Sequence, residues 1–171
     1  MNKEDVLKHF LNAFTAYYNI EEENVTPPFA AEAKFHTHDE GYWLIKSAKL
    51  SEAESDEYVF FALCEDLTME AYRDFDEKAW EEGLKRTQPF NGMQNSDVTL
   101  IIIADRIDKA VKKKAAAVNH FKSYKFGLYG MSHFRLVALE LSTEAVIYNR
   151  QGSNLKKLVN NILSHAKASI K

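Results

Sequence analysis

Cysteine is almost missing from this chain of 171 residues, in which Cys64 is the only one. A single thiol excludes an internal disulfide framework and any zinc module built from several cysteines. Cys64 ends the apolar run YVFFALC, which favours a buried structural thiol over a nucleophile.

Long hydrophobic runs are missing as well. No apolar stretch approaches the ~20 residues that are needed to cross a bilayer. The amino-terminal sequence MNKEDVLKHFLNAF has charges throughout and lacks the apolar core of a signal peptide. The sequence therefore predicts a cytoplasmic protein with no membrane partner.

An excess of positive charge is absent too. The formal net charge is −3 at pH 7, so nucleic acid is not an expected partner. There are only six glycines and three prolines, and the 46% of apolar residues is typical of a folded chain rather than a disordered one. A chain of this length buries a sizeable core, and we expect residues 1–171 to form a single globular domain.

Apolar residues at helical spacing predict four helices. The first follows Asn2, a residue type that caps helices, and its apolar stripe runs from Val6 to Tyr18. The second begins at Thr68, another capping residue type. The last three helices are expected at about residues 68–86, 108–119 and 154–166.

Segments rich in aromatic and β-branched residues predict seven strands, at about residues 30–38, 42–50, 57–65, 98–105, 123–130, 133–141 and 144–149. The first three have short connections, which predicts an antiparallel meander. Residues 98–105 are apolar at consecutive positions, as in a central strand that is covered on both faces. The helix at 108–119 should then lead to 123–130 through a right-handed parallel crossover.

The order of these elements, α-β-β-β-α-β-α-β-β-β-α, predicts the fold class. We expect an α/β protein with a single mixed β-sheet of about seven strands, flanked by helices on both faces.

The sequence KFHTHDEGYW, residues 34–43, raises the question of a metal site. His36 and His38 are two apart in a predicted strand, so their side chains share a face and could share an ion. A zinc site needs at least one further ligand, and the residues Asp39-Glu40-Gly41 are typical of a hairpin loop. We favour the turn and predict no metal or other cofactor.

Acidic residues stand where strands are expected to end, at Glu65, Asp66 and Asp105. Ligands bind at the carboxyl ends of parallel strands in open sheets, which makes Asp105 the best placed of the three. Acids at such positions also start ordinary loops and caps, and we favour this interpretation.

The element order resembles the core of restriction-endonuclease-like nucleases. That resemblance implies Mg²⁺ held by an Asp on one strand and a Glu/Asp-x-Lys triplet on the next. Residues 42–50 contain no acid, and residues 57–65 contain no Lys two positions after an acid. A divalent metal would therefore be expected only in a degenerate, nuclease-like hydrolase that combines the strand-end acids with His36 and His38.

Several basic residues offer weaker candidates for ligand binding. The lysines of the predicted helix at 108–119 are best explained as a solvated face. Arg150 precedes the last helix, whose amino-terminal amides could hold an anion, although a loop and cap are favoured there.

Three segments resemble an uncharacterised bacterial family of small soluble proteins that is known only as a domain of unknown function. They are VTLIIIADR, FKSYKFGLYG and FRLVALEL followed by NRQG. The resemblance covers about a third of the chain and implies no reaction or catalytic residues.

The FKSYKFGLYG segment carries Lys122, Tyr124 and Lys125, and Arg135 follows on the next strand, so a positive, aromatic surface is one interpretation. The favoured interpretation is that Tyr124, Phe126 and Leu128 alternate into the core and the lysines face solvent.

We conclude from the sequence that a non-enzymatic binding protein for a protein partner or small molecule is the leading hypothesis. Its site would be the positive hairpin or a strand-end cleft. The metal-dependent hydrolase is the alternative. A homodimer stays open, with Trp43 and Trp80 as interface candidates, although a core position is favoured for each.

Overall fold

The computed structural model describes residues 2–36 and 55–168. Within these residues the α-helices are α1 Lys3–Phe14, α2 Met69–Arg86, α3 Lys109–Ala117 and α4 Lys156–Ala168. The strands are β1 Asn19–Glu21, β2 Ala31–His36, β3 Ser55–Leu67, β4 Asn95–Ile107, β5 Phe121–Ser123, β6 Met131–Glu140 and β7 Ala145–Tyr148. Two short 3₁₀ helices, η2 Lys125–Gly127 and η3 Gly152–Leu155, complete the elements.

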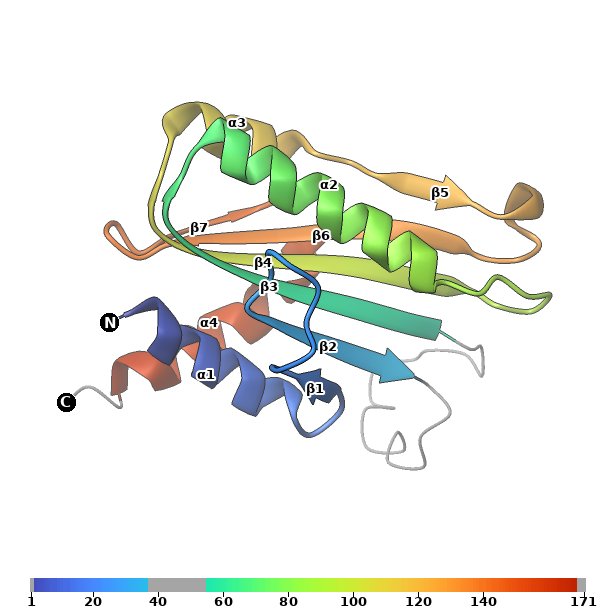
Figure 1. Ribbon diagram of the computed structural model, residues 1–171, viewed down its shortest axis with the longest axis horizontal. Helices are drawn as coiled ribbons and strands as arrows, with labels where there is room; N and C mark the ends of the chain where they lie inside the picture. The colour runs from blue at the N-terminus through green and yellow to red at the C-terminus, as the bar shows by residue number, and fades with distance from the viewer. Residues whose placement is uncertain (1, 37–54, 169–171) are drawn as a thin grey trace.

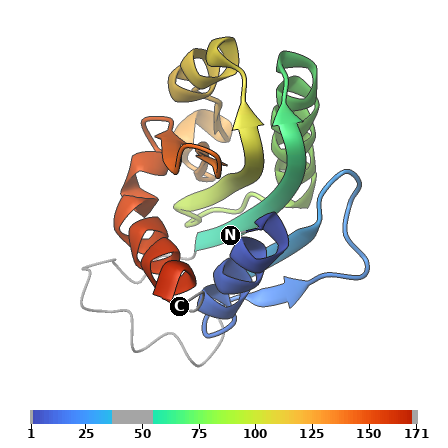
Figure 2. The same ribbon diagram turned by 90° about the vertical axis from the view of Figure 1, so that its left-hand side faces the viewer.

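The strands form one mixed sheet in the order β1-β2-β3-β4-β6-β5, with β7 also paired to β6. Strand β4 runs parallel to both β3 and β6, while β1, β2, β5 and β7 pair antiparallel. Helices α2 and α3 cover one face of the sheet, and α1 and α4 cover the other (Figures 1 and 2). The predicted α/β class and the mixed sheet with helices on both faces are confirmed.

Strand β4 is the centre of the sheet, as the run of consecutive apolar residues predicts. Its even-numbered residues Leu100 and Ile102 pack under α2 and α3, and its odd-numbered residues Ile101 and Ile103 pack under α1 and α4. All four are buried. Burial on both faces leaves no place for an unpaired polar side chain in this strand, and the buried Thr99 hydroxyl donates to Glu57.

The helix caps lie where the sequence places them. The Asn2 side chain accepts a hydrogen bond from the Asp5 amide at 2.7 Å, and the Thr68 hydroxyl accepts one from the Ala71 amide at 3.3 Å. Helix α1 ends at Phe14, one turn earlier than its apolar stripe. The chain then turns, and Tyr18 reaches back to β3.

Three expectations about the strands need correction. Residues 124–130 do not form a strand, because the backbone takes a left-handed conformation at 125–127, and of this segment only Phe121–Ser123 pairs with β6. Strand β5 is antiparallel to β6, so β6 is the strand that the parallel crossover through α3 reaches. Strand β2 pairs directly with β3, which replaces the meander, and the strand expected at 42–50 lies outside the described residues.

Two further residues were expected at a dimer interface or in the core. The Trp80 ring is partly buried against the core under α2 and stacks on His120, with ring centroids 5.5 Å apart. Trp43 lies outside the described residues.

The contact between α2 and β4 leads to a prediction about Gly83. A Cβ at this position would lie 2.3 Å from Val98 Cγ2, so the helix can approach the sheet only with glycine. We expect Gly83→Ala to lower the free energy of unfolding by about 1–3 kcal/mol. In an unobstructed helix the same change would raise it by about 0.5–1 kcal/mol. Urea denaturation measures the difference.

Val98→Ala provides the matched background. Once the valine methyls are removed, Gly83→Ala should be neutral or stabilising. In a double-mutant cycle, the two substitutions together should therefore destabilise the protein less than the sum of their separate effects. A destabilisation of equal size in both backgrounds would mean that the Val98 contact is not the cause.

Candidate functional site

The covered sheet leaves its charged groups at the two ends of the parallel strands. At the carboxyl end, two of the three strand-end acids form ion pairs with cations of neighbouring segments. Asp105 binds the Lys3 ammonium of α1 at 2.9 Å, and Asp66 accepts hydrogen bonds from Arg106 Nε and Nη2 at 2.5 and 2.8 Å. Glu65 is exposed. Asp105, the acid that the sequence analysis placed best, thus holds the start of α1 against the sheet.

Glu140 is a further carboxylate at this end, and it is buried. It accepts hydrogen bonds from the Lys112 ammonium at 2.6 Å, the Ile107 amide at 2.9 Å and the Thr143 hydroxyl. Burial alone raises the pKa of Glu140, but these three donors outweigh it and hold the pKa below its usual value. Glu140 therefore joins the end of β4, helix α3 and the turn before β7.

The histidine and acid positions of the hydrolase hypothesis lie at opposite ends of the sheet. The backbone of His36 pairs with Asp56 at the start of β3, and Asp66 near the end of β3 pairs with Arg106. Ten residues of strand separate these two positions, or about 33 Å. His36 and the strand-end acids cannot share one metal ion, and His38 lies outside the described residues.

At the amino-terminal end, an ionic network spans three parallel strands. Arg135 of β6 lies between two carboxylates on the α1/α4 face of the sheet. It donates to Asp97 of β4 and reaches Glu57 of β3 at 3.2 Å. Only 23% of the Arg135 side chain is exposed. Arg135 thus pairs with acids of the sheet and does not extend a positive surface with Lys122.

Two hydroxyl groups and a histidine complete this network. Glu57 accepts hydrogen bonds from the Tyr18 hydroxyl at 2.7 Å and the Thr99 hydroxyl at 2.6 Å, and His133 Nδ1 lies 3.3 Å from Asp97. Burial raises the pKa of Asp97 despite the nearby Arg135 guanidinium, and burial followed by the Glu57 charge raises the pKa of Tyr18. Because these charges already satisfy one another, the network is best suited to hold β3, β4 and β6 in place.

The loop between β5 and β6 has a different character. The Tyr124 hydroxyl lies 2.9 Å from the buried Ser132 hydroxyl, and the Tyr124 amide donates to the Gly130 carbonyl at 3.0 Å. Between these two anchors the side chains of Phe126 and Leu128 project into solvent, with exposed fractions of 102% and 69%. The expectation that Phe126 and Leu128 belong to the core is therefore wrong.

The backbone of this loop is unusual. Lys125 and Phe126 have φ angles of 46° and 57°, in the left-handed region, and Gly127 follows with a φ of 89°. Residues with a Cβ avoid this region, at a cost of about 1–2 kcal/mol each. The fold therefore holds Phe126 outward in a strained conformation.

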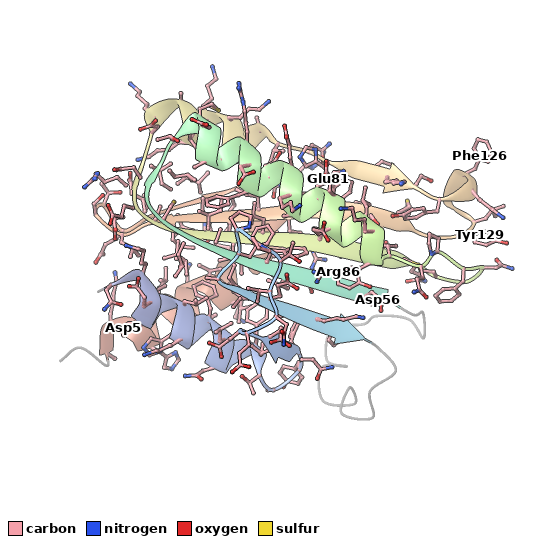
Figure 3. All side chains as sticks on the ribbon, viewed as in Figure 1. Asp5, Asp56, Glu81, Arg86, Phe126 and Tyr129 are labelled. Atoms are coloured by element: carbon pink, nitrogen blue, oxygen red, sulfur yellow. The ribbon has the colours of Figure 1, made fainter. Side chains whose placement is uncertain are left out.

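Lysines and tyrosines surround the base of the loop. The Lys122 ammonium lies 5.4 Å from the centre of the Tyr124 ring, and the Lys125 ammonium lies 4.2 Å from that of Tyr129. Figure 3 shows Phe126 and Tyr129 at one extremity of the molecule, at the amino-terminal end of the parallel strands. The candidate residues Lys122, Tyr124 and Lys125 are thus brought together.

A second loop, residues 87–94 between α2 and β4, lies beside the first. The Met131 amide donates to the Gln94 carbonyl at 3.1 Å, and a Cβ at Gly130 would lie 3.0 Å from the Met93 carbonyl oxygen. Phe90 of this loop is 40% exposed. Phe90, Phe126 and Leu128 therefore project from neighbouring loops, and we refer to these three residues as the apolar tip.

Arg150 belongs neither to the ionic network around Arg135 nor to the loops of the apolar tip. It is exposed in the turn after β7, next to the buried Asn149. The Asn149 carboxamide accepts hydrogen bonds from the Leu136 and Gly152 amides at 2.9 and 2.7 Å and donates to two carbonyls. The asparagine therefore shapes this turn, and Arg150 is a surface residue.

A family model described as a domain of unknown function (DUF8052) matches residues 2–161. The chain belongs to this family. Comparison with curated proteins and with solved structures finds no match. Membership of DUF8052 assigns no activity, so the site has to be interpreted from its own geometry. Among the described helices, none has the length and apolar character that a membrane span requires.

The ionic network predicts a large effect of Arg135→Met. Loss of the guanidinium leaves the largely buried Glu57 and Asp97 carboxylates beside each other without a cation, which should destabilise the fold by about 3 kcal/mol at pH 7. Burial raises the pKa of Asp97, and loss of the nearby cation raises it further in the folded state, so protonation of this carboxyl favours folding at low pH. The loss should therefore shrink as the pH falls from 7 to 4.

Arg150→Met is the matched control, because Arg150 is exposed. Its effect should stay within about 0.5 kcal/mol across this pH range. Urea denaturation at several pH values measures both variants. A loss for Arg135→Met that does not change with pH would contradict the role of the carboxylates.

Proposed function

We propose that this protein is a non-enzymatic cytoplasmic binding protein that docks its partner through the β5–β6 loop. The observation that carries this proposal is the fully exposed Phe126 side chain on a left-handed backbone. An apolar ring gains nothing for the fold from this position, since hydrophobic stabilisation comes from area removed from water.

Strain supports the same conclusion. Residues in sparsely populated backbone conformations persist where the surroundings hold them, and they concentrate at binding and active sites. Lys125 and Phe126 are two such residues in succession. Packing does not explain the strain at Phe126, because its side chain is fully exposed.

The base of the loop supplies rigidity. Tyr124 is fixed to Ser132 and Gly130, and Gly130 is packed against the neighbouring loop at Met93. A tip on a rigid base loses little conformational entropy when a partner binds, which raises affinity.

The hydrolase alternative lacks comparable support. Within residues 2–36 and 55–168, no group of three or more His, Cys, Asp or Glu side chains is placed to hold a metal ion. The strand-end acids Asp105 and Asp66 are engaged with Lys3 and Arg106. A docking surface requires no such convergence of acids.

Photo-crosslinking inside cells tests the proposed function whatever the chemical nature of the partner. A photoreactive phenylalanine analogue is placed at position 126 and, as a control, at the exposed Glu144 of the β6–β7 turn. We expect a crosslinked adduct at position 126 and none at 144. Absence of any adduct at 126, whether to protein or to lipid, would overturn the proposal.

The strain predicts a stability gain on substitution. Phe126→Asn replaces an exposed aromatic ring by a residue that tolerates positive φ, and we expect the free energy of unfolding to rise by about 0.5–1 kcal/mol. Glu144→Asn, at a φ of 56°, relieves the same kind of strain at a position remote from the tip, but it also removes the 2.6 Å ion pair with Lys167, so a smaller gain is expected. Thermal and urea denaturation measure both. A loss of stability for Phe126→Asn alone would show that the ring supports the fold.

A further inference from the structure

Resting on the proposed function, we infer that the docking partner is an anionic membrane surface. The apolar tip enters the headgroup region, while Lys122 and Lys125 contact lipid phosphates. The binding is peripheral and reversible.

The two loops have a local charge that differs from that of the whole chain. No Asp or Glu occurs between Asp108 and Glu140, and residues 87–94 carry no charge. The net charge of −3 disfavours a membrane partner for the chain as a whole, but the two loops themselves contain none of its acidic residues. At the tip, the only formal charges of these loops are the lysines 122 and 125, which suit a leaflet rich in anionic lipid.

The order of residues along the tip also fits an interface. Fully exposed Phe126 and Leu128 form its apex, and Tyr124 and Tyr129 lie behind them with a lysine over each ring. Aromatic rings favour the boundary between headgroups and acyl chains, and lysines extend from apolar surroundings toward phosphate. Phe126 and Leu128 thus suit the acyl-chain region of a bilayer surface, and the lysine–tyrosine pairs behind them suit its headgroup region.

Size favours a membrane over a folded protein. A stable protein–protein interface buries about 800 Å² on each partner. The apolar tip by itself offers less than that, since it consists of one leucine and two aromatic rings of roughly 150–250 Å² each at most, of which Phe90 is only 40% exposed. A convex tip needs a pocket of matching shape in a protein, whereas a fluid bilayer closes around it.

Three features set the expected strength of binding. Few apolar side chains take part, only two lysines add attraction, and the rest of the chain is acidic, so weak and salt-dependent association is expected. Removing one large apolar side chain from such an anchor should weaken it about tenfold or more.

Vesicle co-sedimentation of the full chain tests the inference. One set of vesicles contains phosphatidylcholine alone and the other contains phosphatidylcholine with phosphatidylglycerol. We expect binding to the anionic set only, and a large decrease when salt rises from about 0.1 to about 1 M, because the Debye length falls from ~10 Å to ~3 Å. Glu144→Asn should bind like the unmodified protein.

Two variants separate the contributions. Phe126→Asn should lower the partition coefficient about tenfold or more, and the double variant Lys122→Ala, Lys125→Ala should lower it and reduce its salt dependence. Circular dichroism checks that each variant is folded.

Three results would overturn the inference. They are no binding of the unmodified protein to anionic vesicles, equal binding to both vesicle sets, and full binding by Phe126→Asn. If the protein does not bind anionic vesicles while position 126 crosslinks to a protein in cells, the membrane inference is wrong and the proposed docking function stands. If the protein neither binds anionic vesicles nor forms a crosslinked adduct at position 126, the proposed function is wrong as well.

Discussion

Burial of the parallel strands on both faces is the constraint on which the rest of this structure depends. Strand β4 packs apolar side chains under α2 and α3 on one face and under α1 and α4 on the other. A polar group in its middle would lie unsatisfied in the core, at a cost of about 1–3 kcal/mol or more. Most charged side chains of these strands therefore lie near the strand ends, and the inner polar residues Thr99 and Arg135 are paired with Glu57 and Asp97. The two ends of the parallel strands differ in what their charged groups do.

At the carboxyl end of the parallel strands, the acids join neighbouring helices and strands. Asp105, Asp66 and Glu140 each bind a cation from a neighbouring segment, and Glu140 also receives a backbone amide. At the amino-terminal end the Arg135 network fixes β3, β4 and β6 on one face of the sheet. The Tyr124 anchor to β6 is thereby rigid, and the strained loop that it supports can present Phe126 to solvent without loosening the core.

The sequence predicts those features that depend on local chemistry or on strong periodicity. The caps at Asn2 and Thr68 and the central position of residues 98–105 follow from residue type and from consecutive apolar residues. Alternation misleads at Phe126, because a loop with left-handed residues can show the same pattern of aromatic and basic residues as a strand. Arg135 could not be assigned either, since its partners come from strands that lie far away in the sequence.

Amide hydrogen exchange of the full chain, with and without vesicles of phosphatidylcholine and phosphatidylglycerol, tests the central claim most directly. The account predicts slower exchange confined to residues 87–94 and 121–131, because only these two loops carry the apolar tip. Exchange at the carboxyl ends of the strands should stay unchanged. Slower exchange centred on α3 or α4, or no change anywhere, would contradict the account.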